Sequence, residues 1–395
     1  MIIFLSYAKE DSARVGQIYK ELKEAGYQPW MDNHDISPGQ DWQFAIQNAI
    51  STCDAAIVFL SSKSVSKTGY VQVEIAEFLK QRERRPEGSI YLIPVRLDPC
   101  AVPARMADLQ YADLFEADGW DRVTASLEKA KHQQSLLREQ GEKLGTFTVF
   151  TRVMQEEWDG LPGYFARLSY PELRGGASAE ACEELNHVFK ADCLSTLHEL
   201  RSNRVDQNPS LWEDKKKYGI ATYQTIQDYR ITFLSESALS IVFTYMVYTG
   251  GVHQNYRFAT ENFALQPVIQ LQLASFFKHD YRKTLGWLSR EALKKQSWER
   301  SLSIEHFANI FDSDEFGKEW LVRGTTFEDN IKVYFTFSGE GLTLYFAPYE
   351  VAAFAAGSWE VTLPYYDLRE ILRPNGLHRL FTTPAVRPKL PMSGL

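Results

Sequence analysis

Apolar and polar residues alternate in blocks along the first third of the chain. Short unbroken apolar runs, typical of strands buried on both faces of a sheet, are separated by stretches in which apolar residues recur at helical spacing. We expect strands at residues 1–7, 27–31, 55–60, 90–95 and 114–115. We expect helices at residues 13–25, 42–50 and 69–79. Strands that alternate with helices in this way predict a parallel, doubly wound α/β sheet.

The pattern changes in the rest of the chain, where strands and helices fall into separate groups. Helical spacing predicts helices at residues 121–140, 179–201, 271–295 and 304–311. Apolar or alternating runs predict strands at residues 146–151, 229–234, 238–248, 333–337, 342–346 and 360–364. Segregated strands and helices favour an α+β domain with an antiparallel sheet.

Composition narrows the classes of partner. The formal net charge of the 395 residues is −8, and it divides into −4 up to residue 133 and −4 beyond it, so neither part has the basic excess of a nucleic-acid-binding protein. The four cysteines are scattered, as in proteins of a reducing compartment. No apolar run is long enough to span a membrane. We therefore expect a cytoplasmic protein without a nucleic-acid or membrane partner.

Three short motifs lie near the ends of the first predicted strands. Residues 4–7 (FLSY) end the first strand, residues 35–39 (DISPG) follow the second, and residues 39–42 (GQDW) open the next helix. In this order they resemble the motifs of TIR domains over residues 1–133. The resemblance implies a flavodoxin-like sheet and self-association through TIR domains. In one class of the family it also implies cleavage of NAD+ at the nicotinamide–ribose bond.

Glu74 is the residue to which the resemblance gives most meaning. NAD-cleaving TIR domains carry a glutamate on the helix after the third strand, usually four residues after a tryptophan; here Tyr70 takes the place of the tryptophan. On a helix this spacing puts ring and carboxylate on one face. A single carboxylate can stabilise the oxocarbenium-like charge that develops as nicotinamide leaves. We expect Glu74 to be catalytic, with NAD+ as substrate and with neither a cofactor nor a metal.

The resemblance also implies a set of residues that contact the substrate. The candidates are Ser6, Tyr7, Lys9, Trp30, Pro38, Gly39 and Tyr70. The first two end a strand at the edge where open α/β sheets bind ligands. The lysine is a candidate for phosphate binding or simply exposed, and the tryptophan stacks on a base or packs in the core. The proline and glycine shape a loop that contacts the neighbouring subunit in TIR assemblies.

The rest of the chain resembles a second family. Residues 248–255 and 346–361 are similar to stretches of an uncharacterised domain found outside the membrane in certain bacterial anti-sigma factors and beside some polysaccharide deacetylases. This resemblance implies binding of an unknown ligand or protein rather than catalysis. We expect a TIR domain at residues 1–133, a linker at 134–146, a sensor or assembly domain at 147–380 and a tail at 381–395.

The two resemblances predict a bacterial NAD+ glycohydrolase. We expect it to be activated by oligomerisation and to act in antiviral defence or cell-death signalling. Two alternatives stay open at this point. One is a TIR cyclase that produces a cyclic ADP-ribose signal, and the other is a non-catalytic TIR scaffold.

Overall fold

In the computed structural model, the described residues divide into two compact units on either side of the bond between Gly141 and Glu142. We call them the N-terminal and the C-terminal unit and describe each by itself. The described residues are 1–35, 46, 49–50, 53–65, 75, 78–79, 82, 89–202, 204–205, 222–249, 255–303, 310–311, 315–327 and 332–382.

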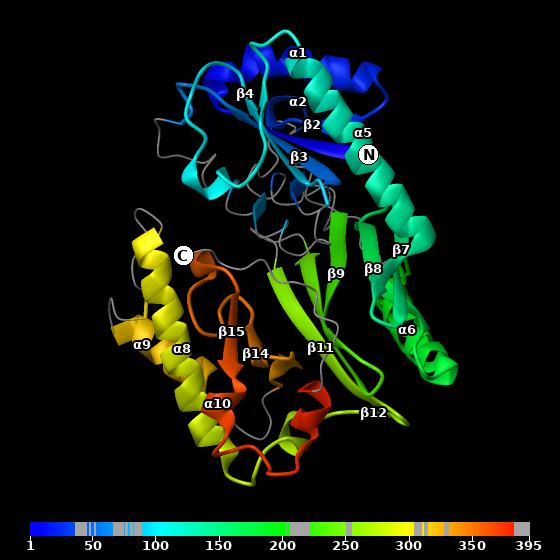
Figure 1. Ribbon diagram of the computed structural model, residues 1–395, viewed down its shortest axis with the longest axis vertical. Coiled ribbons are helices and arrows are strands. Elements are labelled where there is room, and N and C mark those ends of the chain that lie inside the picture. Colours follow the sequence, from blue (N-terminus) through cyan, green and yellow to red (C-terminus); the bar gives the residue numbers. More distant parts are fainter. Residues whose placement is uncertain are drawn as a thin grey trace. The chain divides into compact units, whose positions relative to one another are not determined.

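The N-terminal unit contains a five-stranded parallel sheet (Figure 1). Its strands are β1 (Ile2–Ser6), β2 (Gln28–Trp30), β3 (Ala55–Leu60), β4 (Leu92–Arg96) and β5 (Ala112–Asp113). They lie in the order β2-β1-β3-β4-β5, and every neighbouring pair is parallel. This order confirms the flavodoxin-like α/β prediction. The fifth strand comes two residues earlier than the sequence pattern indicated.

Both faces of this sheet are covered, which explains why β3 reads as an unbroken apolar run. Ile57 and Phe59 point to one face, where they pack against α1 (Ser12–Glu24) and α5 (Gly119–Gln140). Ala56 and Val58 point to the other face, where they pack with Ile46, Ile50, Ile75 and Phe78. Burial on both faces is the property that makes parallel strands continuously hydrophobic.

Short helical turns follow the first two strands. One is η1 (Lys9–Asp11) and the other is α2 (Asp32–Asp35), in a region where the sequence predicted a loop. Helix α1 ends before Gly26, whose φ of +82° lies in the left-handed region that glycine adopts without strain. A third turn, η2 (Ala104–Met106), precedes β5.

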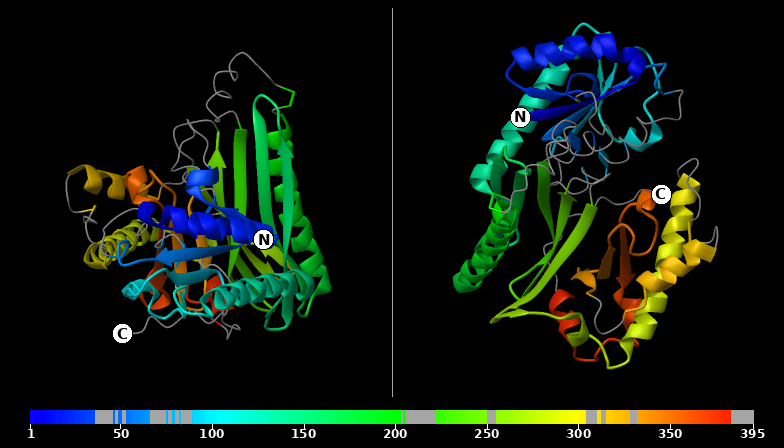
Figure 2. Two further views of the ribbon diagram at one scale, coloured as in Figure 1. Left: turned by 90° about the horizontal axis from the view of Figure 1, so that it is seen from above. Right: turned by 180° about the vertical axis from the view of Figure 1, so that it is seen from behind.

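The C-terminal unit is built on a seven-stranded sheet in the order β12-β11-β10-β9-β8-β7-β6 (Figure 2). The strands are β6 (Glu142–Leu144), β7 (Phe147–Trp158), β8 (Gly163–Gly175), β9 (Thr222–Leu234), β10 (Ala238–Tyr248), β11 (Asn255–Leu265) and β12 (Val268–Gln270). Helix α6 (Ala179–Ser202) packs on one face through residues such as Leu185, Phe189 and Leu197. The expected antiparallel sheet is in fact mixed, because β8 and β9, on either side of α6 in the chain, pair in parallel.

A second, three-stranded antiparallel sheet belongs to the same unit. Its strands β13 (Tyr334–Phe337) and β14 (Gly341–Phe346) form the predicted hairpin, and β15 (Trp359–Pro364) pairs with β14. The remaining elements are η3 (Leu273–Ser275), α8 (Tyr281–Ser303), α9 (Glu315–Gly324), η4 (Phe354–Ala356), α10 (Tyr365–Leu368) and η5 (Leu377–Phe381). The helix predicted at residues 271–295 was wrong at its start, since α8 begins only at Tyr281.

Side chains of the large sheet bind the backbone of β13. The Phe337 N–H donates to Ser240 Oγ at 2.8 Å, and Asn262 Nδ2 donates to the Phe335 carbonyl at 2.9 Å. The Phe335 N–H donates to Thr260 Oγ1 at 3.1 Å. The edge of the small sheet is therefore satisfied by side chains that rise from the face of the large one.

The expected linker and tail contain regular structure where they are described. Within residues 134–146, α5 continues to Gln140 and β6 follows at once. At the other end η5 reaches Phe381, and residues 383–395 lie outside the described residues. None of the described helices is long and apolar enough to cross a membrane.

Candidate functional site

The strand order of the N-terminal unit marks one place for a ligand. It changes direction between β1 and β3, which are neighbours in the sheet with Ser6 opposite Val58. In doubly wound sheets of this order, ligands bind beyond the carboxyl ends of the two strands at that point. Ser6, predicted as a substrate-binding residue, ends β1 there and is buried.

Tyr7 follows Ser6 and is held by Asp32, the second residue after β2. The Tyr7 hydroxyl donates to Asp32 Oδ1, and the Asn33 N–H donates to the same oxygen at 2.7 Å. Burial, followed by the hydrogen bond to this carboxylate, raises the pKa of Tyr7 well above its usual value. The phenol is therefore protonated at neutral pH, and its proton points to the carboxylate.

The loop after β3 is fixed to two neighbouring elements. Ser61 Oγ donates to Asp11 Oδ2 at 2.7 Å, which ties the loop to the start of α1. Ser62 donates to Asp98, just beyond β4, from its N–H at 2.7 Å and from its hydroxyl at 3.0 Å. The Ser61 N–H donates to Ser64 Oγ at 2.8 Å and closes the turn. Polar side chains thus brace the carboxyl edge of the sheet across three strands.

Trp30 and Lys9, two further candidates, have different surroundings. Trp30 is half-buried and stacks on Phe4, with ring centroids 4.7 Å apart and an interplanar angle of 25°. Phe4 in turn contacts the Phe78 ring edge-on at 5.1 Å. One face of the Trp30 ring therefore packs on the core. Lys9 is exposed and opens η1, two residues after Tyr7.

Glu74, Tyr70, Pro38 and Gly39 lie outside the described residues. The nearest described residue to Glu74 in sequence is Ile75, which is fully buried, as is Phe78. Both side chains pack in the cluster that contains Phe4 and Val58. Ile75 and Phe78 therefore lie on the face of β1 and β3, the two strands that flank the predicted ligand position.

The described part of the chain holds no group of three or more histidine, cysteine or acidic residues that could bind a metal ion.

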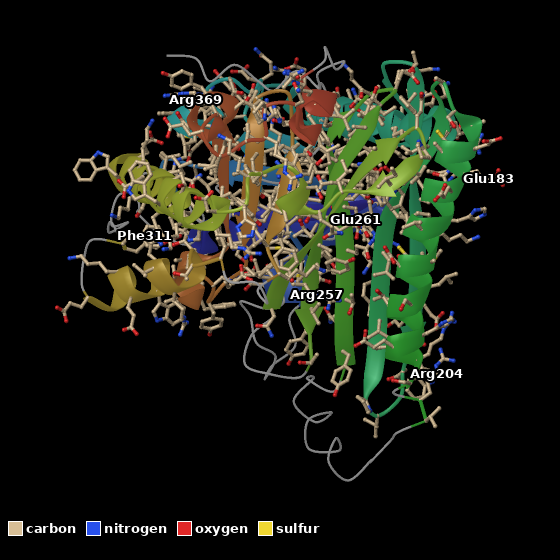
Figure 3. The ribbon with its side chains drawn as sticks, turned by 90° about the horizontal axis from the view of Figure 1, so that it is seen from below. Glu183, Arg204, Arg257, Glu261, Phe311 and Arg369 are labelled. Carbon is tan, nitrogen blue, oxygen red and sulfur yellow. The ribbon has the colours of Figure 1, made fainter. Side chains whose placement is uncertain are left out.

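The C-terminal unit has a polar cluster where α6 ends (Figure 3 labels Arg204). Glu156 accepts hydrogen bonds from Arg201 Nη2 at 2.5 Å, from Arg204 Nη2 at 3.1 Å and from the Tyr164 hydroxyl. The Arg201 and Tyr164 hydrogen bonds lower the pKa of Glu156 to about 2. The Arg204 guanidinium lies 5.2 Å from the centre of the Trp158 ring. This cluster fastens α6 to β7 and β8.

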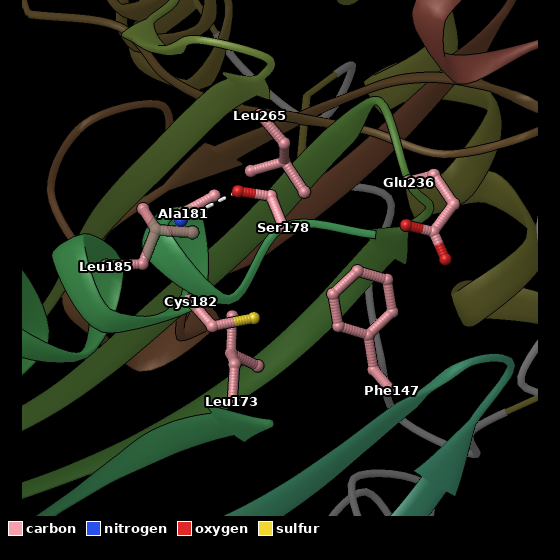
Figure 4. A pocket seen from close by; sticks show the side chains of 8 residues that line it. All are labelled: Phe147, Leu173, Ser178, Ala181, Cys182, Leu185, Glu236 and Leu265. Atoms are coloured by element: carbon pink, nitrogen blue, oxygen red, sulfur yellow. Dashed lines mark hydrogen bonds between the residues drawn. The ribbon is translucent and has the colours of Figure 1, made fainter. Parts of the chain in front are cut away.

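A small apolar cavity lies between α6 and the large sheet (Figure 4). It has room for about one water molecule, too little for an organic ligand. Burial raises the pKa of the Cys182 thiol in its wall, which disfavours the reactive thiolate form. Glu236, on the opposite side, accepts from the Ala177 N–H at 2.5 Å and from the Thr146 hydroxyl. The cavity is a packing defect rather than a site.

Three family models match the chain in succession. The model described as TIR domain matches residues 3–129. The chain carries an N-terminal TIR domain. Behind it, the model described as deacetylase PdaC matches residues 164–256 and that of a protein of unknown function, DUF3298, matches residues 274–366. The resemblances drawn from the sequence are thereby confirmed for both parts of the chain.

Solved structures of both kinds are similar to it. A DUF3298 protein from Bacteroides fragilis shares 18% identity over 62% of this chain and 100% of its own, with a TM-score of 0.47. A DUF3298 protein from Pseudomonas aeruginosa shares 13% identity over 61% of this chain and 97% of its own, with a TM-score of 0.38. The TIR domain of a Toll-related receptor from Hydra magnipapillata shares 21% identity over 32% of this chain and 97% of its own, with a TM-score of 0.28. No curated protein sequence matches the chain.

Sequence reasoning missed three residues at the edge of the TIR sheet. Asp32 holds Tyr7, and Asp11 holds Ser61. Asp32 and Ser61 follow directly behind predicted strands, and the carboxyl ends of parallel strands meet at one edge, so their position was available from the pattern. Asp11 gave no such signal.

Proposed function

We propose that the TIR domain is an NAD+ glycohydrolase in which Glu74 is the catalytic carboxylate. TIR domains act in signalling, and some of them are NADases. The proposal is supported above all by a TIR match that runs through residues 3–129 and so includes Glu74, four residues after an aromatic ring. The burial of Ile75, the next residue, against the face of β1 and β3 supports it further.

The reaction needs little from the protein. The bond between the ribose C1′ and the nicotinamide nitrogen breaks, and its electron pair leaves with nicotinamide, which becomes neutral. Water then bonds to C1′ and releases a proton, giving ADP-ribose. Positive charge builds up on the ribose in the transition state, and a carboxylate beside it lowers the barrier.

A second candidate is the non-catalytic scaffold, and one observation favours it. Tyr70 stands where the NAD-cleaving class usually has tryptophan. A tyrosine ring can still stack on the substrate, so we expect an altered rate rather than a lost reaction. A cyclase would use the same bond cleavage but an adenine nitrogen in place of water, and it differs only in its product.

The test is nicotinamide release by the full-length protein, with products separated by chromatography. We expect Glu74→Gln to lower turnover by about 100-fold or more, the usual loss when a group that stabilises transition-state charge is removed. Glu77→Gln, one turn further along the predicted helix, is the matched control and should keep activity. ADP-ribose as co-product supports the glycohydrolase, and its cyclic form the cyclase. Equal turnover in wild type and Glu74→Gln would contradict the proposal.

We further propose that activity depends on self-association and serves a defence or cell-death response in the cytoplasm. Unregulated NAD+ hydrolysis would be toxic, so the site should be completed only on assembly. Specific activity should therefore rise with protein concentration, and Gly39→Glu in the predicted loop should abolish that rise. Loss of NAD+ from cells that express the wild type but not Glu74→Gln would support the cellular role. The scaffold is favoured if the purified protein shows no turnover at any concentration and if cells that express it lose no NAD+.

A further inference from the structure

The outer edge of β7 in the C-terminal unit is largely open. On one side β8 pairs with β7 along its whole length, from Phe147 to Trp158. On the other side β6 reaches only residues 147–149. Among the described residues, no strand adjoins residues 150–158 on that side. An edge of this length is a template for pairing with another strand.

The direction of the backbone groups along this edge follows from the neighbouring strand. The Leu173 N–H donates to Asn186 Oδ1 at 2.7 Å, and its carbonyl accepts from Asn186 Nδ2 at 2.9 Å, so both groups point away from β7. Leu173 stands opposite Val149, whose groups must therefore point away from β8 as well. The Ser169 carbonyl likewise points away from β7, because it accepts from Gln227 Nε2 at 3.0 Å. Val153 stands opposite Ser169, so its backbone groups also point away from β8.

Because these directions alternate along a strand, every second residue after Val149 presents its N–H and C=O to the open edge. These residues are Thr151, Val153, Gln155 and Glu157. All four are exposed, and Val153 is 44% exposed. Within the described residues no hydrogen bond is formed to their backbone groups from that side.

We infer that two copies of the chain pair through these edges, antiparallel about a two-fold axis at Met154. This register sets Val153 opposite Gln155 of the second copy and Thr151 opposite its Glu157. Each of these pairs consists of two outward-pointing residues, so the ladder closes with about eight hydrogen bonds. An isologous contact of this kind is self-limiting and gives a dimer.

The side chains select this register among those that the backbone allows. With the axis at Met154, Arg152 faces Glu156 of the second copy and Phe150 faces its Trp158, and opposite charges and paired rings both favour cross-strand contact. An axis at Val153 would place Phe150 opposite a glutamate. An axis at Arg152 would set two arginines against each other.

Charged side chains often protect an edge strand from pairing, but two of the three on β7 are neutralised within the chain. Arg152 forms an ion pair with Glu172 at 2.7 Å, and Glu156 forms one with Arg201 at 2.5 Å. Neither side chain therefore repels the second copy, and the contact between Arg152 and its Glu156 adds to these two ion pairs. The contact lies in the C-terminal unit and is independent of the NAD+ proposal, but it would join two TIR domains in one particle.

The first test is the molar mass of the full-length protein by light scattering during size exclusion. At about 100 µM, where an interface of micromolar affinity is saturated, we expect a dimer. Val153→Pro removes only an outward N–H and leaves the ladder with β8 intact, so it should fold with the wild-type circular dichroism spectrum and weaken the dimer at least tenfold. Val153→Thr is the control and should dimerise. A monomeric wild type, or a folded Val153→Pro variant that dimerises normally, would overturn the inference.

The second test fixes the register and does not depend on the proline variant. Met154→Cys brings two thiols together across the axis, at a Cα separation of about 4.5 Å, close enough for a disulfide between copies. Gln155→Cys places its thiol opposite Val153 and should not cross-link. We expect an oxidised covalent dimer on a non-reducing gel for the first variant only. Cross-linking of the second alone would contradict the register, and TIR self-association would affect both variants equally.

Discussion

Asn262 on β11 gives the sharpest test of how the C-terminal unit holds its two sheets together. It is 2% exposed, donates to the Phe335 carbonyl at 2.9 Å and accepts from the Ser240 hydroxyl. Replacement by leucine keeps the approximate volume but removes both hydrogen bonds. The Phe335 carbonyl and the Ser240 hydroxyl are then left without this partner in a buried place.

The expected loss follows from those two groups. Each buried group that loses its partner costs about 1–3 kcal/mol, and leucine recovers part of this through apolar burial. The Ser240 hydroxyl still accepts from the Phe337 N–H, so it contributes less than the Phe335 carbonyl to the loss of stability. We therefore expect Asn262→Leu to lower the free energy of unfolding of the C-terminal unit by about 2–4 kcal/mol.

Hydrogen exchange measured by mass spectrometry is the appropriate assay, because the chain has two units and a single unfolding midpoint would mix them. Peptides from β13 and β14 should lose protection in Asn262→Leu, whereas those from β1 and β3 should not. Asn255→Leu, an exposed position on the same strand, is the control and should change stability by less than about 0.5 kcal/mol. Equal protection in the two variants would refute the role of the buried hydrogen bonds.

Three further predictions concern single side chains. Phe78→Ala, at a fully buried position, should destabilise the N-terminal unit by about 3–5 kcal/mol, measured by exchange in β3. Asp32→Asn should lower the pKa of Tyr7 in an ultraviolet titration, because it removes the carboxylate that disfavours the phenolate. The pKa of Glu156 is about 2 when folded and 4.5 ordinarily, so its contribution to stability is present above pH 4.5 and lost as the pH falls towards 2. Hydrogen exchange in peptides from β7 and β8 should show wild type losing about 1–2 kcal/mol more than Glu156→Gln over that range, a figure discounted for solvent screening.

Where burial alone determines an element, the sequence predicted it well. Residues 55–60 and 238–248 are strands with the predicted bounds. The start of α8 was wrong for a reason that lies elsewhere in the chain. The Lys278 N–H donates to the Ile371 carbonyl at 2.8 Å, and the Arg373 N–H donates to the Phe276 carbonyl at 3.0 Å. These contacts join segments almost a hundred residues apart and hold the apolar residues before α8 outside any helix.

The parallel pair in the large sheet was missed because β8 was missed. Its sequence, residues 163–175, mixes charged side chains and a proline with apolar ones, and the alternation of buried and half-buried positions changes phase between Leu168 and Ser169. Without β8, the predicted strand before α6 is that at residues 146–151, and the β8–α6–β9 crossover cannot be inferred. Strong local hydrophobicity is thus a sufficient signal for a strand, but its absence excludes nothing.

At the site, sequence reasoning located strand ends better than the contacts made there. Ser6 lies at the carboxyl end of β1 as expected, and Tyr7 follows it. The partner of Tyr7 is 25 residues away and that of Ser61 is 50 residues away. Asp11 occupies the N-cap position of α1 but makes no side-chain capping bond, and its carboxylate binds Ser61 instead. Local spacing cannot distinguish these two uses of one aspartate.

These contacts bear on how completely the loss of Glu74 should abolish turnover. Three carboxylates at this edge of the TIR domain already accept hydrogen bonds, Asp11 from Ser61, Asp32 from Tyr7 and Asp98 from Ser62. To stabilise a ribosyl cation, one of them would have to release its donor, at a cost of about 1–3 kcal/mol. None is therefore a ready substitute for Glu74. Glu74→Gln should fall to background, whereas Asp32→Asn should retain measurable turnover; the reverse order would move the catalytic role to Asp32.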